Sequence, residues 1–195
     1  MRRTLGFVLV TLFVVAPRAS AGLPRTHDGL MLRLSGGFGF DSTELEDLEL
    51  SGTGFDGNFA IGGMVGTNLA LHGTLWGWDV SDPDVEGGDI EGELQGNVSM
   101  WALGGGLTYY MMPTNIYFTG SLGMGKLNIE DEDGDDYDTD MGIALDLAVG
   151  KEWWVGNSWG LGVAGSMNYH SFSDDVVDEN WEGISFGIRF SATMN

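Results

Sequence analysis

Three residues near position 170 carry the side chains that a hydrolase uses. His170 is followed closely by Ser173 and Asp174. Nucleophilic catalysis needs a hydroxyl, a base within hydrogen-bond reach of it, and a third group that orients the base. No catalytic sequence motif surrounds these residues. We therefore favour an ordinary polar role for His170 and predict that the chain has no catalytic residue. If it is an enzyme, the candidates are His170, Ser173 and Asp174.

Five charged residues sit among small residues in otherwise apolar stretches, and they could line an ion or proton path. If their surroundings are buried, these charges must pair, because an unpaired buried charge costs several kcal/mol. We expect Arg33 and Arg189 to share Asp146 and Glu152, so a structural ion-pair network is favoured over a conducting path. The five residues are Arg33, Asp56, Asp146, Glu152 and Arg189.

An acid-rich segment around Gly134 suggests a calcium loop, with Asp131, Asp133, Asp135 and Asp136 as candidate ligands. In an EF-hand loop the first ligand lies five residues before the glycine. Ile129 occupies that position, so the pattern excludes an EF-hand. We predict a solvated anionic loop that binds divalent cations weakly at most, with no defined metal site and no cofactor.

The stretch 141–171 indicates the elements that hold these residues. On its first arm, Ile143, Leu145 and Leu147 alternate with small or charged residues, and the second arm repeats the pattern. Alternate side chains of a strand point to opposite faces. The arms are joined by the turn 156–158. Each arm is long enough to cross a bilayer as a tilted strand, which takes about 9–11 residues.

The same alternation predicts eight strands in all. In the strand at 95–112, Val98 and Met100 follow one parity whereas Trp101 and Leu103 follow the other, so we expect a bulge near Gly105 to switch its faces. The remaining strands are expected at about 29–40, 55–66, 69–79, 115–128, the two arms within 141–171, and 181–191.

The connections between these strands alternate in length and charge. Short uncharged turns alternate with four long acidic segments, which hold 25 of the 29 acidic residues and no Lys or Arg. Long loops at one end and short turns at the other are typical of outer-membrane barrels. Aromatic residues gather at the strand ends, where we expect interfacial girdles: Tyr110, Tyr117, Trp153, Trp154 and Trp159 at one end, and Phe40, Phe55, Phe172 and Trp181 at the other.

The N-terminal residues and the composition indicate export of the protein and exclude one class of partner. Arg2 and Arg3 precede a short apolar run and an Ala-Ser-Ala site, which predicts a cleaved signal peptide at 1–21 and a single domain at 22–195. The chain has no cysteine and a net charge of −21. Nucleic acid is excluded as a partner, because its phosphates require Lys and Arg.

The hairpin pattern, the loop asymmetry, the aromatic last strand and the segments 106–110 and 150–154 together resemble the small eight-stranded outer-membrane β-barrel proteins, the OmpA/OmpX-like group. The resemblance implies an all-β, antiparallel, up-and-down transmembrane barrel in the bacterial outer membrane. It also implies contact with outer-membrane lipid and lipopolysaccharide. Assembly would depend on the barrel assembly machinery, which reads a last strand ending in an aromatic residue, here Phe190.

We expect a non-enzymatic structural or surface-interaction role through the acidic loops, with a plugged lumen, because an eight-stranded barrel is just wide enough for side chains to fill. Three alternatives stay open. They are a narrow channel for small apolar molecules or ions, a lipid-modifying outer-membrane hydrolase, and a soluble periplasmic barrel that holds a ligand.

Overall fold

The computed structural model describes residues 27–87, 90–131, 136–174 and 179–195, and every regular element within them is a β-strand. The predicted signal peptide at 1–21 lies outside these residues, as do Asp133 and Asp135. No helix in the described ranges is long and apolar enough to cross a membrane.

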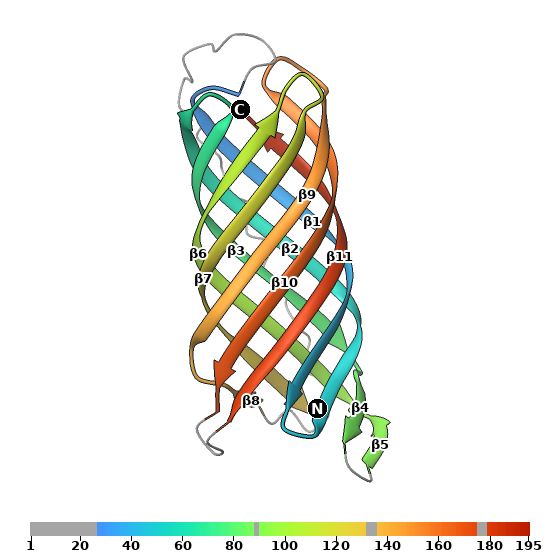
Figure 1. The fold of residues 1–195 in the computed structure, drawn as a ribbon. Helices are drawn as coiled ribbons and strands as arrows, with labels where there is room; N and C mark the ends of the chain where they lie inside the picture. Colours follow the sequence, from blue (N-terminus) through green and yellow to red (C-terminus); the bar gives the residue numbers. More distant parts are fainter. Residues whose placement is uncertain (1–26, 88–89, 132–135, 175–178) are drawn as a thin grey trace, which may run out of the picture.

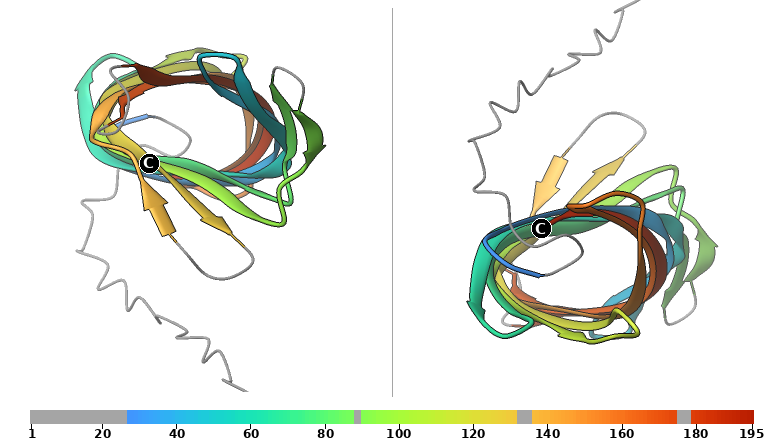
Figure 2. Two further views of the ribbon diagram at one scale, coloured as in Figure 1. Left: turned by 90° about the horizontal axis from the view of Figure 1, so that it is seen from below. Right: turned by 90° about the horizontal axis from the view of Figure 1, so that it is seen from above.

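Eight long strands form one antiparallel sheet that closes on itself (Figure 1). Each strand pairs with the next one along the chain, and β1 also pairs with β11, over 13 residue pairs from Leu32–Met194 to Glu44–Glu182. Seen along its axis in Figure 2, the sheet is a ring. The prediction of an eight-stranded up-and-down barrel is confirmed. Its strands are β1 (Leu30–Leu45), β2 (Leu48–Gly66), β3 (Leu69–Ser81), β6 (Gly96–Met111), β7 (Ile116–Asp131), β9 (Gly142–Trp154), β10 (Trp159–Ser173) and β11 (Asn180–Met194).

The two ends of the barrel differ. At the short-turn end, brief turns join β2 to β3, β6 to β7 and β9 to β10. At the long-loop end, three short strands extend the sheet: β4 (Asp84–Gly87), which pairs with β2, β5 (Ile90–Glu93), which pairs with β4, and β8 (Asp136–Asp138), which pairs with β7. Figure 2 shows the β7–β8 hairpin projecting away from the ring.

The first acidic segment is not the loop that the sequence predicted. β1 continues to Leu45 and β2 begins at Leu48, so only two residues separate the strands. The alternation of faces persists through these acids, since Glu44 lies outward between Glu49 and Glu182 on the neighbouring strands. Charged side chains that face solvent leave the backbone free to continue its ladder of hydrogen bonds.

The faces of the sheet are inverted relative to a soluble protein. Large apolar side chains point away from the axis, with Phe38 69%, Leu122 61% and Ile188 60% exposed. Polar and charged side chains, Arg33 and Arg189 among them, are buried inside. A leucine or phenylalanine on this outer face has no protein core to enter.

The face switch predicted near Gly105 is wrong. β6 keeps regular register with both β3 and β7, and Val98 and Met100 point into the lumen together with Tyr110. The register shift lies in β2 instead, between Met64 and Gly66. Near the long-loop end the lumen is filled by apolar side chains. Val98 and Met100 are therefore apolar although they point inward, and the sequence-based interpretation took them for outward residues after a switch of faces.

Four of the aromatic residues expected in the girdles are buried in the lumen instead: Tyr110, Tyr117, Phe172 and Trp181. Trp153, Trp159, Phe40 and Phe55 do lie outward and exposed. Two lumen glycines make room for the inward rings. A Cβ at Gly150 would lie 2.5 Å from Tyr117 Cζ, and one at Gly183 would lie 2.3 Å from His170 Cε1.

Candidate functional site: the lumen

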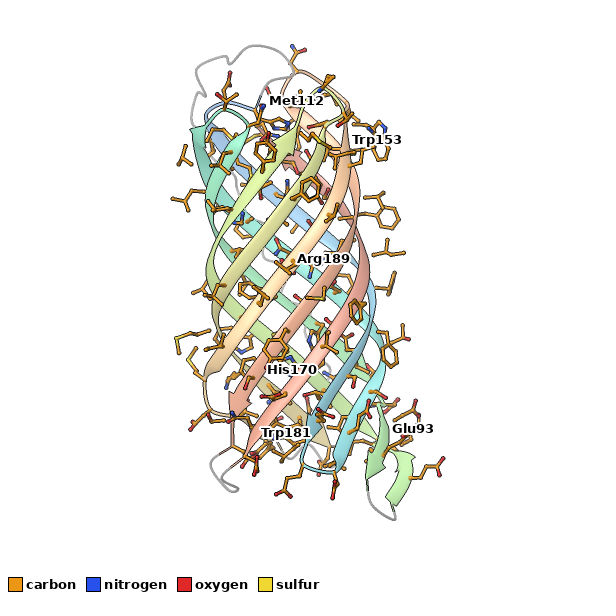
Figure 3. The ribbon with its side chains drawn as sticks, viewed as in Figure 1. Glu93, Met112, Trp153, His170, Trp181 and Arg189 are labelled. Carbon is orange, nitrogen blue, oxygen red and sulfur yellow. The ribbon has the colours of Figure 1, made fainter. Side chains whose placement is uncertain are left out.

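A charged cluster fills the middle of the lumen, around Arg189 of β11 (Figure 3). Arg189 makes a bidentate contact with Asp56 of β2, in which Nε donates to Oδ2 and Nη2 donates to Oδ1, both at 2.7 Å. Its Nη1 donates to Asp146 Oδ1 of β9, also at 2.7 Å. One guanidinium therefore links strands β2, β9 and β11 by charge-assisted hydrogen bonds, which are stronger than neutral ones.

Neutral side chains satisfy the remaining oxygens of this cluster. Ser166 Oγ donates to Asp56 Oδ2 at 2.8 Å, and Asn58 Nδ2 donates to Asp146 Oδ2 at 3.0 Å. With its amide turned to suit both neighbours, Asn168 donates to Asp146 Oδ1 at 2.8 Å and accepts from Arg189 Nη2 at 3.2 Å. A buried charge cluster is tolerable only when it is satisfied in this way.

A second cluster lies closer to the short-turn end, around Arg33 of β1. Arg33 Nη2 donates to Glu152 Oε1 at 3.2 Å and to Tyr110 Oη at 2.6 Å, and Nε donates to Thr193 Oγ1 at 3.1 Å. The Tyr117 ring lies 4.0 Å from the guanidinium carbon, a cation–π contact. The two expected acids are divided between the arginines: Arg33 pairs with Glu152, whereas Arg189 pairs with Asp146 and also with Asp56.

Residues just before β1 cover this second cluster. The His27 ring stacks on Tyr110 with centroids 3.5 Å apart, and His27 Nε2 lies 2.7 Å from Asn115 Oδ1. Asn115 follows β6 in the turn to β7 and also donates to Glu152 O at 3.3 Å. The strap at residues 27–29 is thus bonded to the rim of the short-turn end.

Apolar and aromatic residues fill the long-loop end. Trp78, Phe172 and Trp181 are buried in one cluster, and the His170 ring stacks on Phe172 at a centroid distance of 4.8 Å. His170 Nε2 lies 3.0 Å from Thr43 Oγ1. Figure 3 shows His170 and Trp181 toward one end, with Met112 and Trp153 at the other.

The structure does not assemble His170, Ser173 and Asp174 into a catalytic unit. His170 points into the lumen, whereas Ser173, three residues along the same strand, is exposed on the opposite face. Asp174 accepts hydrogen bonds from Tyr137 Oη and from Trp181 Nε1, the latter at 3.0 Å. No described residue bonds to His170 Nδ1 to orient the ring, which a general base requires.

The candidate cation ligands are only partly described. Asp131 ends β7 and Asp136 begins β8, and among the residues with described positions no three His, Asp or Glu side chains form a group able to hold a metal. Nearby, Lys126 Nζ donates to Asp138 Oδ2 at 2.5 Å, and this bond lowers the pKa of Asp138. The hairpin therefore neutralises one of its own acids.

Asp41 is a lumen residue that the sequence-based reasoning missed, because it was assigned to an acidic loop. It is 2% exposed and forms no ion pair with a described residue. Its parity along β1, shared with Arg33, Ser35 and Gly37, was the available signal. Tyr110 and Thr193, which hold Arg33, were missed as well.

Comparison with known proteins supports this architecture. No protein-family model matches the sequence. No curated protein matches it either. Among solved structures, Neisserial surface protein A superposes with a TM-score of 0.60 at 12% identity, covering 85% of this chain and 96% of that one. Outer membrane protein AlkL, whose structure was determined by solid-state NMR in lipid bilayers, gives a TM-score of 0.51 at 16% identity, covering 92% and 95%.

The chain has the fold of the small eight-stranded outer-membrane barrels. At this level of identity the likeness extends to the strands, their order and their closure. It does not extend to particular side chains, so the arrangement of Arg33 and Arg189 rests on this chain's own contacts.

Replacing Arg189 with methionine would leave Asp56 and Asp146 as two unpaired buried carboxylates. We expect Arg189→Met to lower the free energy of unfolding by about 3–5 kcal/mol, measured by urea titration of the barrel folded in lipid vesicles. Adding Asp56→Asn and Asp146→Asn should recover most of the loss. Lys126→Met, which breaks the exposed pair with Asp138, is the control and should cost about 1 kcal/mol or less. Equal losses for Arg189→Met and Lys126→Met would contradict a buried network.

Proposed function

We propose that this protein spans the bacterial outer membrane as a closed barrel and acts at the cell surface through its acidic long-loop end. The observation that carries the membrane placement is the exposed apolar outer face of all eight barrel strands. Contiguous exposed apolar surface of this extent marks an interaction site or a membrane contact. The predicted signal peptide and the likeness to known outer-membrane barrels support the same placement.

We infer that the lumen is closed, which favours a role other than that of a wide pore. Three successive layers cross the barrel: the Arg33 cluster, the Arg189 cluster and the aromatic cluster around Trp78 and Phe172. Eight strands leave an interior that side chains can fill completely. In this proposal the buried ion pairs are structural, and the acidic long-loop end is the functional surface.

The acidic end is built to meet positive charge. Glu49, Glu44 and Glu182 lie directly opposite one another on β2, β1 and β11, facing outward. Like charges placed opposite one another repel, so cationic groups nearby stabilise the row. We infer that the surface partners are cationic, with divalent ions able to bridge these carboxylates to the phosphates of lipopolysaccharide. Nucleic acid is not among the partners we propose.

The last strand fits delivery to the outer membrane. β11 pairs with β1 to close the ring and places Phe186, Ile188 and Phe190 outward in sequence. We propose that the barrel assembly machinery recognises this strand, although four residues follow Phe190 before β11 ends at Met194.

A narrow channel is a second candidate, and one observation favours it. Several buried polar atoms along the lumen accept or donate no hydrogen bond to the described residues, among them His72 Nδ1, Ser121 Oγ and Glu152 Oε2. Such atoms are usually satisfied by water, and a file of water would allow small ions or protons to enter. The hydrolase alternative has no comparable support, because His170 and Ser173 lie on opposite faces.

Ile188 lies next to Arg189, near the middle of the barrel height, and faces outward. We expect Ile188→Arg to destabilise the bilayer-folded barrel by about 2–4 kcal/mol, because a charge there must enter hydrocarbon. Ser171→Arg, also outward but near the long-loop end, should cost about 0–1 kcal/mol. The measurement is the unfolding free energy in vesicles. Equal effects at the two positions would show that the outer face does not meet a membrane.

Neutralising the acidic row tests the surface role. We expect the triple change Glu44→Gln, Glu49→Gln and Glu182→Gln to weaken adhesion of bilayer-embedded protein to a polylysine-coated surface, most strongly at low salt where charges are least screened. Ser171→Ala lies beside the row and keeps its charge, so it serves as the control. Binding that ignores both salt and the triple change would remove the acidic end as the interaction surface.

Single-channel recording separates the two candidates. We expect the wild-type barrel in a planar bilayer to show no stepwise ion current, because three filled layers block the lumen. A water-filled porin added to the same bilayer confirms that currents are detectable. Reproducible current steps from the wild-type barrel would favour the channel and overturn the closed lumen.

A further inference from the structure

The outer wall of the barrel is interrupted by a groove across β7, β9 and β10. It has a volume of about 400 Å³, within the range of small-ligand sites, and its surface is almost wholly apolar. The outward position occupied by Gly165 of β10 opens it, since glycine supplies no side chain there. Its walls are Phe118, Leu147, Val149 and Met167.

The groove is not needed for the protein's own packing. A Cβ added at Gly165 would meet no atom within 4 Å, so a larger residue fits there without strain. By contrast, the outward glycines Gly36 and Gly57 are covered by the ring of Phe55, which would lie 3.1 Å and 3.2 Å from an added Cβ. Glycine weakens a strand interior. A bare glycine at Gly165 therefore leaves space that only a group from outside the chain can fill.

The ammonium group of Lys151 lies near one end of this groove. Lys151 faces outward on β9, two residues beyond Val149, and Trp153 follows two residues later on the same face. At about 3.3 Å per residue, the lysine lies about 7 Å from the edge of the groove along the strand. Lys151 Nζ donates to Thr114 O at 2.6 Å and lies 5.7 Å from the Trp153 ring centroid.

Lys151 differs from the other outward-facing lysine. Lys126, at the long-loop end, pairs with Asp138. Lys151 forms no ion pair with any carboxylate in the described ranges, and two of its three ammonium protons remain available after the bond to Thr114. A lysine beside an outward tryptophan at the end of an apolar belt is placed at the level of lipid headgroups.

We propose that Lys151 and the groove form a binding site for one phospholipid with a net negative headgroup, in the leaflet at the short-turn end. The lipid phosphate lies at Lys151 Nζ, and one acyl chain runs past Val149 and Leu147 into the space over Gly165. The site rests on the membrane placement proposed above. The groove continues the apolar belt, so its occupant is hydrocarbon, and the unpaired cation at the matching depth selects an anionic headgroup.

The test uses the full barrel in nanodiscs made from equal amounts of phosphatidylglycerol and phosphatidylcholine, with retained lipid measured by native mass spectrometry after release. We expect phosphatidylglycerol to be retained preferentially, at one lipid per barrel. Lys151→Gln should lower that preference about fivefold, the effect of one lysine near a membrane surface. Gly165→Leu should abolish retention of either lipid by filling the groove.

Two matched controls are available. Lys126→Gln removes the outward lysine at the other end, and Gly105→Leu fills an outward glycine of β6, where an added Cβ meets only His72 O at 3.6 Å. Both should retain lipid as the wild type does. Excess inorganic phosphate should not compete, because it lacks an acyl chain.

The outcomes separate this site from the membrane placement. A barrel that fails to insert into the nanodisc overturns both proposals. A barrel that inserts but retains both lipids equally, or whose preference survives both Lys151→Gln and Gly165→Leu, overturns the lipid site alone. A barrel dimer that Gly165→Leu disrupts would assign the groove to a second copy of the chain and would also overturn it.

Discussion

The pairing of β1 with β11 is the constraint on which the rest of this structure depends. Once these strands meet, the ring of eight long strands is closed, and neighbouring strands satisfy one another's backbone groups around the whole ring. Closure also divides the side chains into two sets that cannot exchange faces. The inner set must fit a narrow lumen and the outer set must face whatever surrounds the barrel. The two arginines inside are stabilised by buried carboxylates, and apolar residues outside require a partner that is not water.

The lumen shows how a narrow barrel accommodates charge. Arg189 and Arg33 each occupy the centre of a cluster whose members come from at least three strands. A buried ion pair is weak evidence for net stability, because desolvation opposes the Coulomb attraction. Its clearer consequence is geometric: one guanidinium reaches Asp56 and Asp146 only if β2, β9 and β11 are in the observed register. A slip by one residue would turn each of these charges outward. The clusters therefore specify the register of the wall as well as filling its interior.

Much of this arrangement could be predicted from alternation alone. The eight strands, their order and the inward direction of Arg33, Asp56 and Asp146 follow from period-two patterning, which is a local property. The choice of partners does not follow, because the acid that meets a given arginine depends on strand tilt and stagger around the whole ring. Tyr110 and Phe172 were misplaced for a different reason. They were assigned to girdles by residue type and position at strand ends, whereas their parity, shared with Thr108 and His170, points inward. Asp41 was assigned to an acidic loop for a similar reason: the composition of its segment was followed, although its parity along β1 points inward.

The outer surface of the barrel is not apolar throughout, and its outward charged side chains lie near the two ends. Acidic side chains accumulate at the long-loop end, where Lys126 is already paired with Asp138. At the opposite end Lys151 faces outward, set between Trp153 and the groove over Gly165. A barrel that only needed to be inserted would gain from a leucine at Gly165, since the space is open and the strand would be stiffer. In the proposed lipid site, Gly165 leaves the space for an acyl chain and Lys151 supplies the charge for its headgroup, while the opposite rim carries mainly acidic side chains. The two ends of one cylinder thus present different chemistry along a single axis.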